Sequence, residues 1–340
     1  MTNASSPPAL RVLPGLVLSL LVAIAAWAMA ERVPFGSAPV LAIVIGLLVG
    51  ALLGPRPVLR PGLRASSSTL LRGAVVVLGA GLPLTTVLGQ GARSLPVIVV
   101  TLGGCLLVAA TLGRKLGIVD PLRTLIGVGT GICGASAIAA VTPVLETKEN
   151  DVGYAVATIF IFNVLAVLTF PPLGHTLGMS QHAFGVFSGT AINDLSSVVA
   201  AGNVYGSTAL ATGVVVKLTR TLMIVPVTAY LAERGAPARP GGAADLRGTF
   251  VRAVARTPRF LLAFLALAAV ASTGLIPADL RPTISELATA MITVALAAVG
   301  LSIDLAGLRR TGARPIVLGA ALWVTVSALS LGAMALGLGG

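Results

Sequence analysis

Long apolar runs, separated by short clusters of arginine, glycine and proline, form the main pattern of this chain. A helix needs about 20 apolar residues to cross the hydrocarbon core of a bilayer. Eleven runs approach that length, so we predict an all-α polytopic membrane protein with about 10–11 transmembrane helices. The runs cover residues 12–30, 37–54, 66–89, 94–113, 121–145, 152–174, 181–203, 207–232, 258–277, 283–304 and 314–338.

The fifth run is interrupted by four glycines between Gly127 and Gly134. Each glycine weakens a helix by about 1 kcal/mol relative to alanine. Non-helical backbone at membrane depth survives only where protein buries it or where it lines a watery cavity. We predict a discontinuous helix with its break near 129–134, whose second half directs N-terminal N–H groups toward an anion. The alternative is that these glycines simply allow close helix packing.

A second polar interruption covers residues 188–197, where six of ten residues are polar. Asp194 is costly at membrane depth and needs a partner, water or a bound cation. The two interruptions match at an offset of 60 residues: Gly129-Thr130, Ile132 and Ser136 correspond to Gly189-Thr190, Ile192 and Ser196. Counted as two crossing spans, these segments would run parallel. The match is therefore accidental, or the span count is wrong here.

The eighth run contains Lys217 and Arg220, which are three residues apart and share a helix face. Two cations against Asp194 leave a net positive cavity, which favours an anionic ligand. The alternative is that Asp194 only neutralises one of them. Asn163, in an apolar stretch, is a candidate for hydrogen bonds across helices or to a ligand.

A weaker internal similarity relates residues 75–99 to 294–318 at an offset of 219. These copies lie in the third and tenth spans, which would run antiparallel, as inverted repeats do in transporters. Arg72 and Glu286 belong to the same spans, and we expect both near a membrane interface.

The composition narrows the function. The chain is 56% hydrophobic and 10% charged, which excludes an ordinary soluble enzyme. The net charge of +12 comes from arginines clustered between apolar runs, and aromatic residues are too few for a nucleic-acid stacking surface. We find no nucleotide motif, no metal-binding spacing and no nucleophile motif, so we expect no cofactor, no nucleic-acid partner and no enzymatic activity.

The charges also predict an orientation. With the N-terminus inside, sixteen of the 23 lysines and arginines lie on the inner side, four outside and three within spans. By the positive-inside rule this predicts a cytoplasmic N-terminus and an outer C-terminus. Arg11 with Ala28-Met29-Ala30 also fits a signal peptide, whose cleavage would leave ten spans.

We divide the chain into four parts. These are an N-terminal helix with the first outer loop (1–36), a first membrane half with the broken-helix core (37–233), a cytoplasmic arginine-rich linker (234–257) and C-terminal membrane helices (258–340).

Several stretches resemble the sulfate exporter family of bacterial inner-membrane proteins. They are 133–140, 155–158, 191–201, 216–221 and 299–305. That family is distantly similar to bile-acid/sodium symporters, which implies inverted repeats with two discontinuous helices that cross at their breaks. The resemblance leads us to expect a histidine where this chain has Asn193, so it does not extend proton transfer to that position.

These inferences predict a secondary transporter for a small anion such as sulfate or an organic sulfonate, in a bacterial inner membrane. The alternative is a Na⁺/H⁺-coupled cation exchanger that uses Asp194, and the oligomeric state stays open. Asp194 is the candidate for the coupling ion. The candidate substrate-binding residues are Thr130, Gly131, Cys133, Gly134, Ser136, Asn163, Thr190, Asn193, Ser196, Ser197, Lys217 and Arg220.

Overall fold

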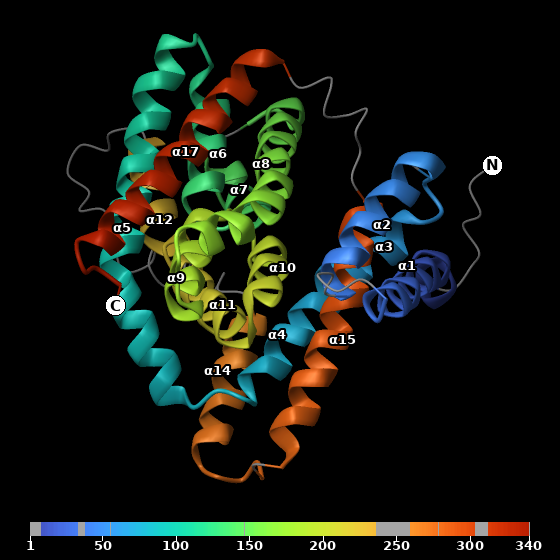
Figure 1. Cartoon of the computed structure of the whole chain (residues 1–340). Coiled ribbons are helices and arrows are strands. Elements are labelled where there is room, and N and C mark those ends of the chain that lie inside the picture. Colours follow the sequence, from blue (N-terminus) through green and yellow to red (C-terminus); the bar gives the residue numbers. More distant parts are fainter. Residues whose placement is uncertain are drawn as a thin grey trace. The chain divides into compact units, whose positions relative to one another are not determined.

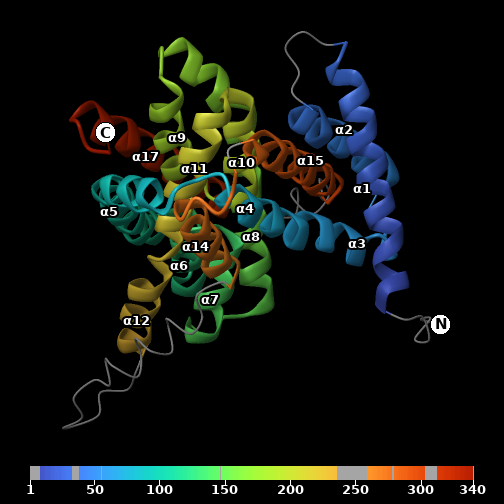
Figure 2. The same ribbon diagram turned by 90° about the horizontal axis from the view of Figure 1, so that it is seen from below.

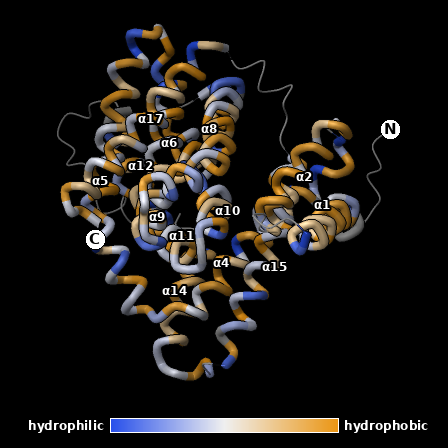
Figure 3. The backbone as a smooth tube through the Cα atoms, in the orientation of Figure 1, coloured by the Kyte–Doolittle hydropathy of each residue, from blue (hydrophilic) through white to orange (hydrophobic). Residues whose placement is uncertain are grey.

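The computed structural model describes residues 8–32, 38–54, 56–145, 147–235, 259–277, 279–302 and 312–339. Regular structure in these residues is helical throughout (Figure 1), which confirms the all-α prediction. Six of these helices are long and apolar enough to cross a membrane, so the chain is a multi-pass membrane protein. Figure 3 shows hydrophobic residues spread along α2 and α8, as lipid-buried helices require.

The helices group into two units by packing. Unit 1 comprises residues 1–87 and 260–306, and unit 2 comprises 88–259 and 307–340. This grouping follows packing and differs from a linear division at 36, 233 and 257. Most of the predicted linker, from 236 on, lies outside the described residues.

Unit 1 depends on close helix contacts at glycine. A Cβ at Gly46 would lie 2.5 Å from the Ala297 carbonyl oxygen, so only glycine allows α2 to approach α15 this closely. Ala42, Val294 and Ala298 fill the adjoining core. The helices are α1 (Pro8–Ala30), α2 (Ala38–Leu53), α3 (Arg60–Arg64), the π-helical turn η1 (Ala65–Leu70), α4 (Leu71–Gly79), α14 (Arg259–Ser272) and α15 (Leu280–Leu301).

Unit 2 holds both predicted interruptions. The first is a break at residues 132–134, within the predicted range, and the second is a break at 192–194. The predicted discontinuous helix near 129–134 is therefore confirmed, and the second break lies within the polar interruption at 188–197. The helices are α5 (Leu84–Lys115), α6 (Asp120–Gly131), α7 (Ala135–Leu145), α8 (Glu149–Thr176), α9 (Gln181–Ala191), α10 (Leu195–Tyr205), α11 (Ser207–Thr221), α12 (Ile224–Gly235) and α17 (Ala313–Ala335).

Helices α9 and α10 form a hairpin rather than a crossing span. The Phe184 ring, near the start of α9, stacks on Tyr205, at the end of α10, with 3.8 Å between centroids. Along α11, a Cβ at Gly185 would meet Thr212, whereas one at Gly202 would meet Leu210. The chain thus turns back at 192–194, and we call residues 181–205 hairpin 2.

Helices α6 and α7 turn back in the same way. Gly129 of α6 lies against the side chains of both Ile138 of α7 and Ile159 of α8. One turn further along α8, Asn163 accepts a hydrogen bond from the backbone at the break of hairpin 2, next to Gly134. Helices α6 and α8 therefore run in the same direction, so α7 has reversed the chain. We call residues 120–145 hairpin 1.

The hairpins correct the predicted topology. The expectation that the runs at 121–145 and 181–203 cross the membrane is wrong, and so is the picture of two crossing helices. Only α8 lies between the hairpins, so they enter the unit from its opposite ends (Figure 2). The match at an offset of 60 thus relates two inverted elements, and the span count was the error.

Candidate functional site

The tips of the two hairpins meet inside unit 2. The tip of hairpin 1 is Ile132-Cys133-Gly134, and the tip of hairpin 2 is Ile192-Asn193-Asp194. Gly134 has a φ of 67°, a left-handed conformation that favours glycine. A Cβ on Gly134 would lie 3.2 Å from the Cβ of Asp194, so the absence of a side chain lets the tips touch.

Lys217 of α11 joins the two tips. Its side chain is completely buried, and its ammonium group Nζ donates hydrogen bonds to the carbonyl oxygens of Ile132, at 3.0 Å, and Ile192, at 2.5 Å. These two acceptors are equivalent at the 60-residue offset. One cation therefore binds the same position in both hairpins.

Arg220, one turn further along α11, is also completely buried and also bonds both hairpins. Its Nε donates to the Gly131 carbonyl at 2.7 Å and its Nη2 to the Thr130 carbonyl at 3.0 Å. Its Nη1 donates to the Thr190 carbonyl and, at 3.5 Å, to that of Ile192. Thr130 and Thr190 are again equivalent at an offset of 60.

These bonds satisfy the C-terminal ends of α6 and α9. The last carbonyl groups of a helix lack partners within it, and the helix dipole places partial negative charge there. Lys217 and Arg220 supply both the missing donors and the opposite charge. We expected these cations to face a ligand directly, whereas the structure directs their hydrogen bonds to backbone carbonyls. In the described part of the chain, no ion pair joins either cation to Asp194.

Asp194 occupies the N-terminal end of α10 and caps it. Its Oδ2 accepts hydrogen bonds from the Ser196 backbone N–H, at 3.1 Å, and from the Ser196 hydroxyl. Its Oδ1 is buried and has no hydrogen-bond partner among the described residues, and the same holds for Oδ1 of Asn193. Acceptors on two consecutive residues are thus left unpaired, which is costly for buried oxygens.

The start of α7 is the more open part of the site. Ala135 and Ser136 are exposed, whereas Leu195 and Ser196 at the start of α10 are half-buried. The first N–H groups of a helix have no partner within it and carry partial positive charge. Hairpin 1 therefore offers accessible donors where hairpin 2 offers a capped helix.

The remaining predicted residues support the tips. Asn163, in the middle of α8, accepts a hydrogen bond from the Asn193 backbone N–H at 3.1 Å. The Thr190 hydroxyl lies 2.6 Å from the Ser330 hydroxyl of α17. Cys133 and Ser197 are buried within the tip region. Sequence reasoning missed Ser330, because it is one of two serines in an apolar run and carries no distinguishing signal.

Comparison with known proteins places the chain among relatives that share almost its whole length. A family model described as Conserved hypothetical protein 698 matches residues 14–319. The UPF0324 membrane protein of Streptococcus pyogenes serotype M18 is 41% identical over 342 residues, which cover 97% of this chain and 98% of the relative. The chain belongs to the UPF0324 family of membrane proteins.

Other members of the family are similar over the same extent. The UPF0324 proteins of Streptococcus agalactiae serotype V and Fusobacterium nucleatum are 38% and 35% identical, and each match covers 94% of this chain and 96% of the relative. The names of these relatives identify them as membrane proteins and specify no substrate.

Proposed function

We propose that this UPF0324 protein is a secondary-active transporter of a small anion, which binds at the meeting point of the hairpin tips. The main observation in support is that two buried cations, Lys217 and Arg220, lie at the same break as the exposed N-terminal end of α7. Family membership is consistent with transport in general. Sulfate and organic sulfonates are the substrates that the sequence resemblance suggests.

The anion would bind at the start of α7. Backbone N–H groups of the first turn, where Ala135 and Ser136 are exposed residues, and the Ser136 hydroxyl supply donors there. Thr130, Gly131, Cys133, Gly134, Thr190, Asn193, Ser196 and Ser197 would form or support the surrounding walls. Lys217 and Arg220 would act through the field of their charges, because their side chains donate hydrogen bonds to carbonyl groups.

The charge balance supports an anionic ligand. The C-terminal ends of α6 and α9 each carry about half a negative charge, so together they offset about one of the two buried positive charges. Asp194 offsets the other, and the starts of α7 and α10 then add about one positive charge in total. The tips as a whole thus favour a ligand with negative charge.

The hairpins also sharpen the proposed orientation. With two fewer crossings, the base of hairpin 1 and the start of α8 lie on the same side as Arg114, Lys115 and Arg123. Lys148 then joins the inner group, which raises the sixteen inner lysines and arginines to seventeen. A cytoplasmic N-terminus and an outer C-terminus therefore remain our proposal under the positive-inside rule.

The unpaired oxygens of Asn193 and Asp194 favour a second candidate, a Na⁺/H⁺-coupled cation exchanger. Buried acceptors without donors on two consecutive residues suit a small cation or a proton. In the leading proposal the same carboxylate would carry the coupling ion. The two candidates differ in whether cation flux requires an anion.

Two measurements test the proposal. In a thermal-shift screen of the purified full chain against inorganic and organic anions, we expect a substrate anion to raise the melting temperature, because it binds only the folded form. The Ser136→Ala variant should reduce that shift. Ser207→Ala is the matched control, because Ser207 is also an exposed serine in the first turn of a helix, at the far end of α11.

The second measurement separates the candidates. In proteoliposomes that contain no transportable anion, the anion transporter should show no ²²Na⁺ flux and no pH-driven flux. Persistent cation flux under these conditions would contradict the anion transporter and support the cation exchanger. If no anion raises the melting temperature and no anion gradient drives uptake, the anion proposal is wrong.

A further inference from the structure

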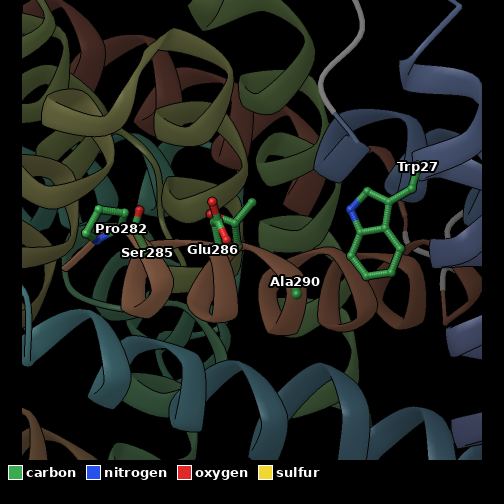
Figure 4. A pocket seen from close by; sticks show the side chains of 6 residues that line it. Trp27, Pro282, Ser285, Glu286 and Ala290 are labelled. Carbon is green, nitrogen blue, oxygen red and sulfur yellow. The ribbon is translucent and has the colours of Figure 1, made fainter. Parts of the chain in front are cut away.

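Unit 1 contains a pocket that the transport proposal does not use. Helices α1 and α15 border an open pocket of about 580 Å³, lined by Trp27, Pro282, Ser285, Glu286, Thr289 and Ala290. Figure 4 shows Ser285 and Glu286 on one side of α15, with the Trp27 indole from α1 at the other end of the pocket. The α15 residues recur at intervals of three or four, so they share one helix face.

Glu286 is an unusual residue for this position. It is exposed, and it belongs to a helix long and apolar enough to cross the membrane. It lies six positions after Leu280, the first residue of α15, which places it about 9 Å along the helix axis. A carboxylate at such a position is costly unless water or a cation accompanies it. Among the residues whose side chains the structure describes, no cationic one pairs with it within 4.0 Å.

The other lining groups complement a cation as well. The face of an indole ring attracts ammonium groups, and tryptophan is the aromatic residue best suited to this interaction. The hydroxyls of Ser285 and Thr289 add hydrogen-bond acceptors beside the carboxylate. Among the residues whose side chains the structure describes, no cationic one lines the pocket. The set of carboxylate, indole and hydroxyls therefore matches a positively charged, partly apolar group.

We propose that this pocket binds an organic ammonium group, with Glu286 as its counter-ion and Trp27 as the aromatic wall. The ammonium group has two available sources: the headgroup of an aminophospholipid in the surrounding bilayer, or a small soluble amine. The pocket lies wholly in unit 1, so this binding does not depend on the proposed anion site in unit 2.

Trp27 itself provides the readout. The chain has two tryptophans, and Trp323 stacks on Phe170 in unit 2. In a Trp323→Phe background of the full chain, Trp27 fluorescence is measured while ethanolamine is added in detergent at constant ionic strength. A second arm compares nanodiscs of phosphatidylglycerol alone with nanodiscs that also contain phosphatidylethanolamine.

Glu286→Gln removes the charge while it keeps the shape of the side chain. We expect it to weaken the ammonium response at least tenfold. Glu233→Gln, which changes an exposed acid on α12, should leave the response unchanged. Asp194→Asn should also leave it unchanged, which distinguishes this pocket from the transport site.

The two arms identify the source. A saturable response to ethanolamine in detergent supports a soluble amine, and a response only in phosphatidylethanolamine nanodiscs supports a lipid headgroup. The proposal is overturned if neither arm produces a saturable change in Trp27 emission, or if Glu286→Gln responds like the parent. Equal melting temperatures of the variants would verify that folding does not account for the difference.

Discussion

Hairpin 1 and hairpin 2 bind the same two cations through equivalent carbonyl groups, yet their tips differ in chemistry. Thr130 and Thr190 bond Arg220, and Ile132 and Ile192 bond Lys217. Where hairpin 1 has Cys133-Gly134, hairpin 2 has Asn193-Asp194. The shared positions are the backbone scaffold, so the two positions that differ are where we expect specific chemistry.

The difference predicts a separate role for each hairpin. Gly134 has no side chain, so the start of α7 keeps its donors open. Asp194 caps the start of α10, and its second oxygen is left without a donor. The comparison thus predicts that an anion binds at hairpin 1 and that a proton or cation binds at hairpin 2.

Removing the shared scaffold should have the largest effect. Arg220→Ala would leave carbonyls of both hairpins buried without donors, at about 1–3 kcal/mol for each. We expect a loss of at least about 4 kcal/mol in stability, or failure to fold, and Arg220→Lys should be intermediate because it keeps only the charge. Thermal melting of the purified protein measures this, with exposed Arg32→Ala as the control. Unchanged melting of Arg220→Ala would mean that the cation does not hold the hairpins.

Changing the chemistry of hairpin 2 should stop transport with little loss of stability. Asp194→Asn keeps an acceptor for the Ser196 N–H, so the cap of α10 survives in part. We expect uptake in proteoliposomes to fall at least about 100-fold, or about 2.7 kcal/mol. Normal expression and melting would distinguish this from unfolding. Wild-type flux in this variant would remove Asp194 from the coupling step.

Hydropathy predicted much of the fold, because composition and run length identify apolar helices directly. The glycines at 127–134 and the polar residues at 188–197 also located both breaks. Hydropathy did not predict the direction of the chain after each break, because two half-helices of 11 or 12 residues have the same hydropathy as one span. The offset of 60 contained the missing information, since an inverted pair requires the chain to turn back at each break.

The roles of Lys217 and Arg220 could be inferred only in part. Two cations in an apolar run signal a buried polar site, and both do lie at the breaks. Their partners are backbone carbonyls, which every residue has, so no sequence pattern distinguishes those that accept. The unpaired oxygens of Asn193 and Asp194 could not be predicted either, because the sequence does not show which side-chain oxygens lack a hydrogen-bond donor.

Gly134→Ala should disturb the contact between the tips. It combines a left-handed φ with a Cβ placed 3.2 Å from that of Asp194, and we expect a loss of about 2 kcal/mol. Gly178→Ala is the matched control, because Gly178 has a φ of 63° and open space around its Cβ position. Equal melting of the two variants would show that strain alone, and not the contact between tips, determines the loss.

The smallest and most discriminating effects should come from the equivalent serines. Ser136→Ala removes an exposed hydroxyl from hairpin 1, so it should weaken anion affinity about tenfold, or about 1.4 kcal/mol, with the same cation dependence. Ser196→Ala removes a donor to the Asp194 carboxylate, so it should change the dependence of uptake on the coupling ion and leave anion affinity nearly intact. Uptake measured against anion and cation concentration separates the two. Identical changes in both variants would mean that the hairpins share one task, despite the different chemistry of their tips.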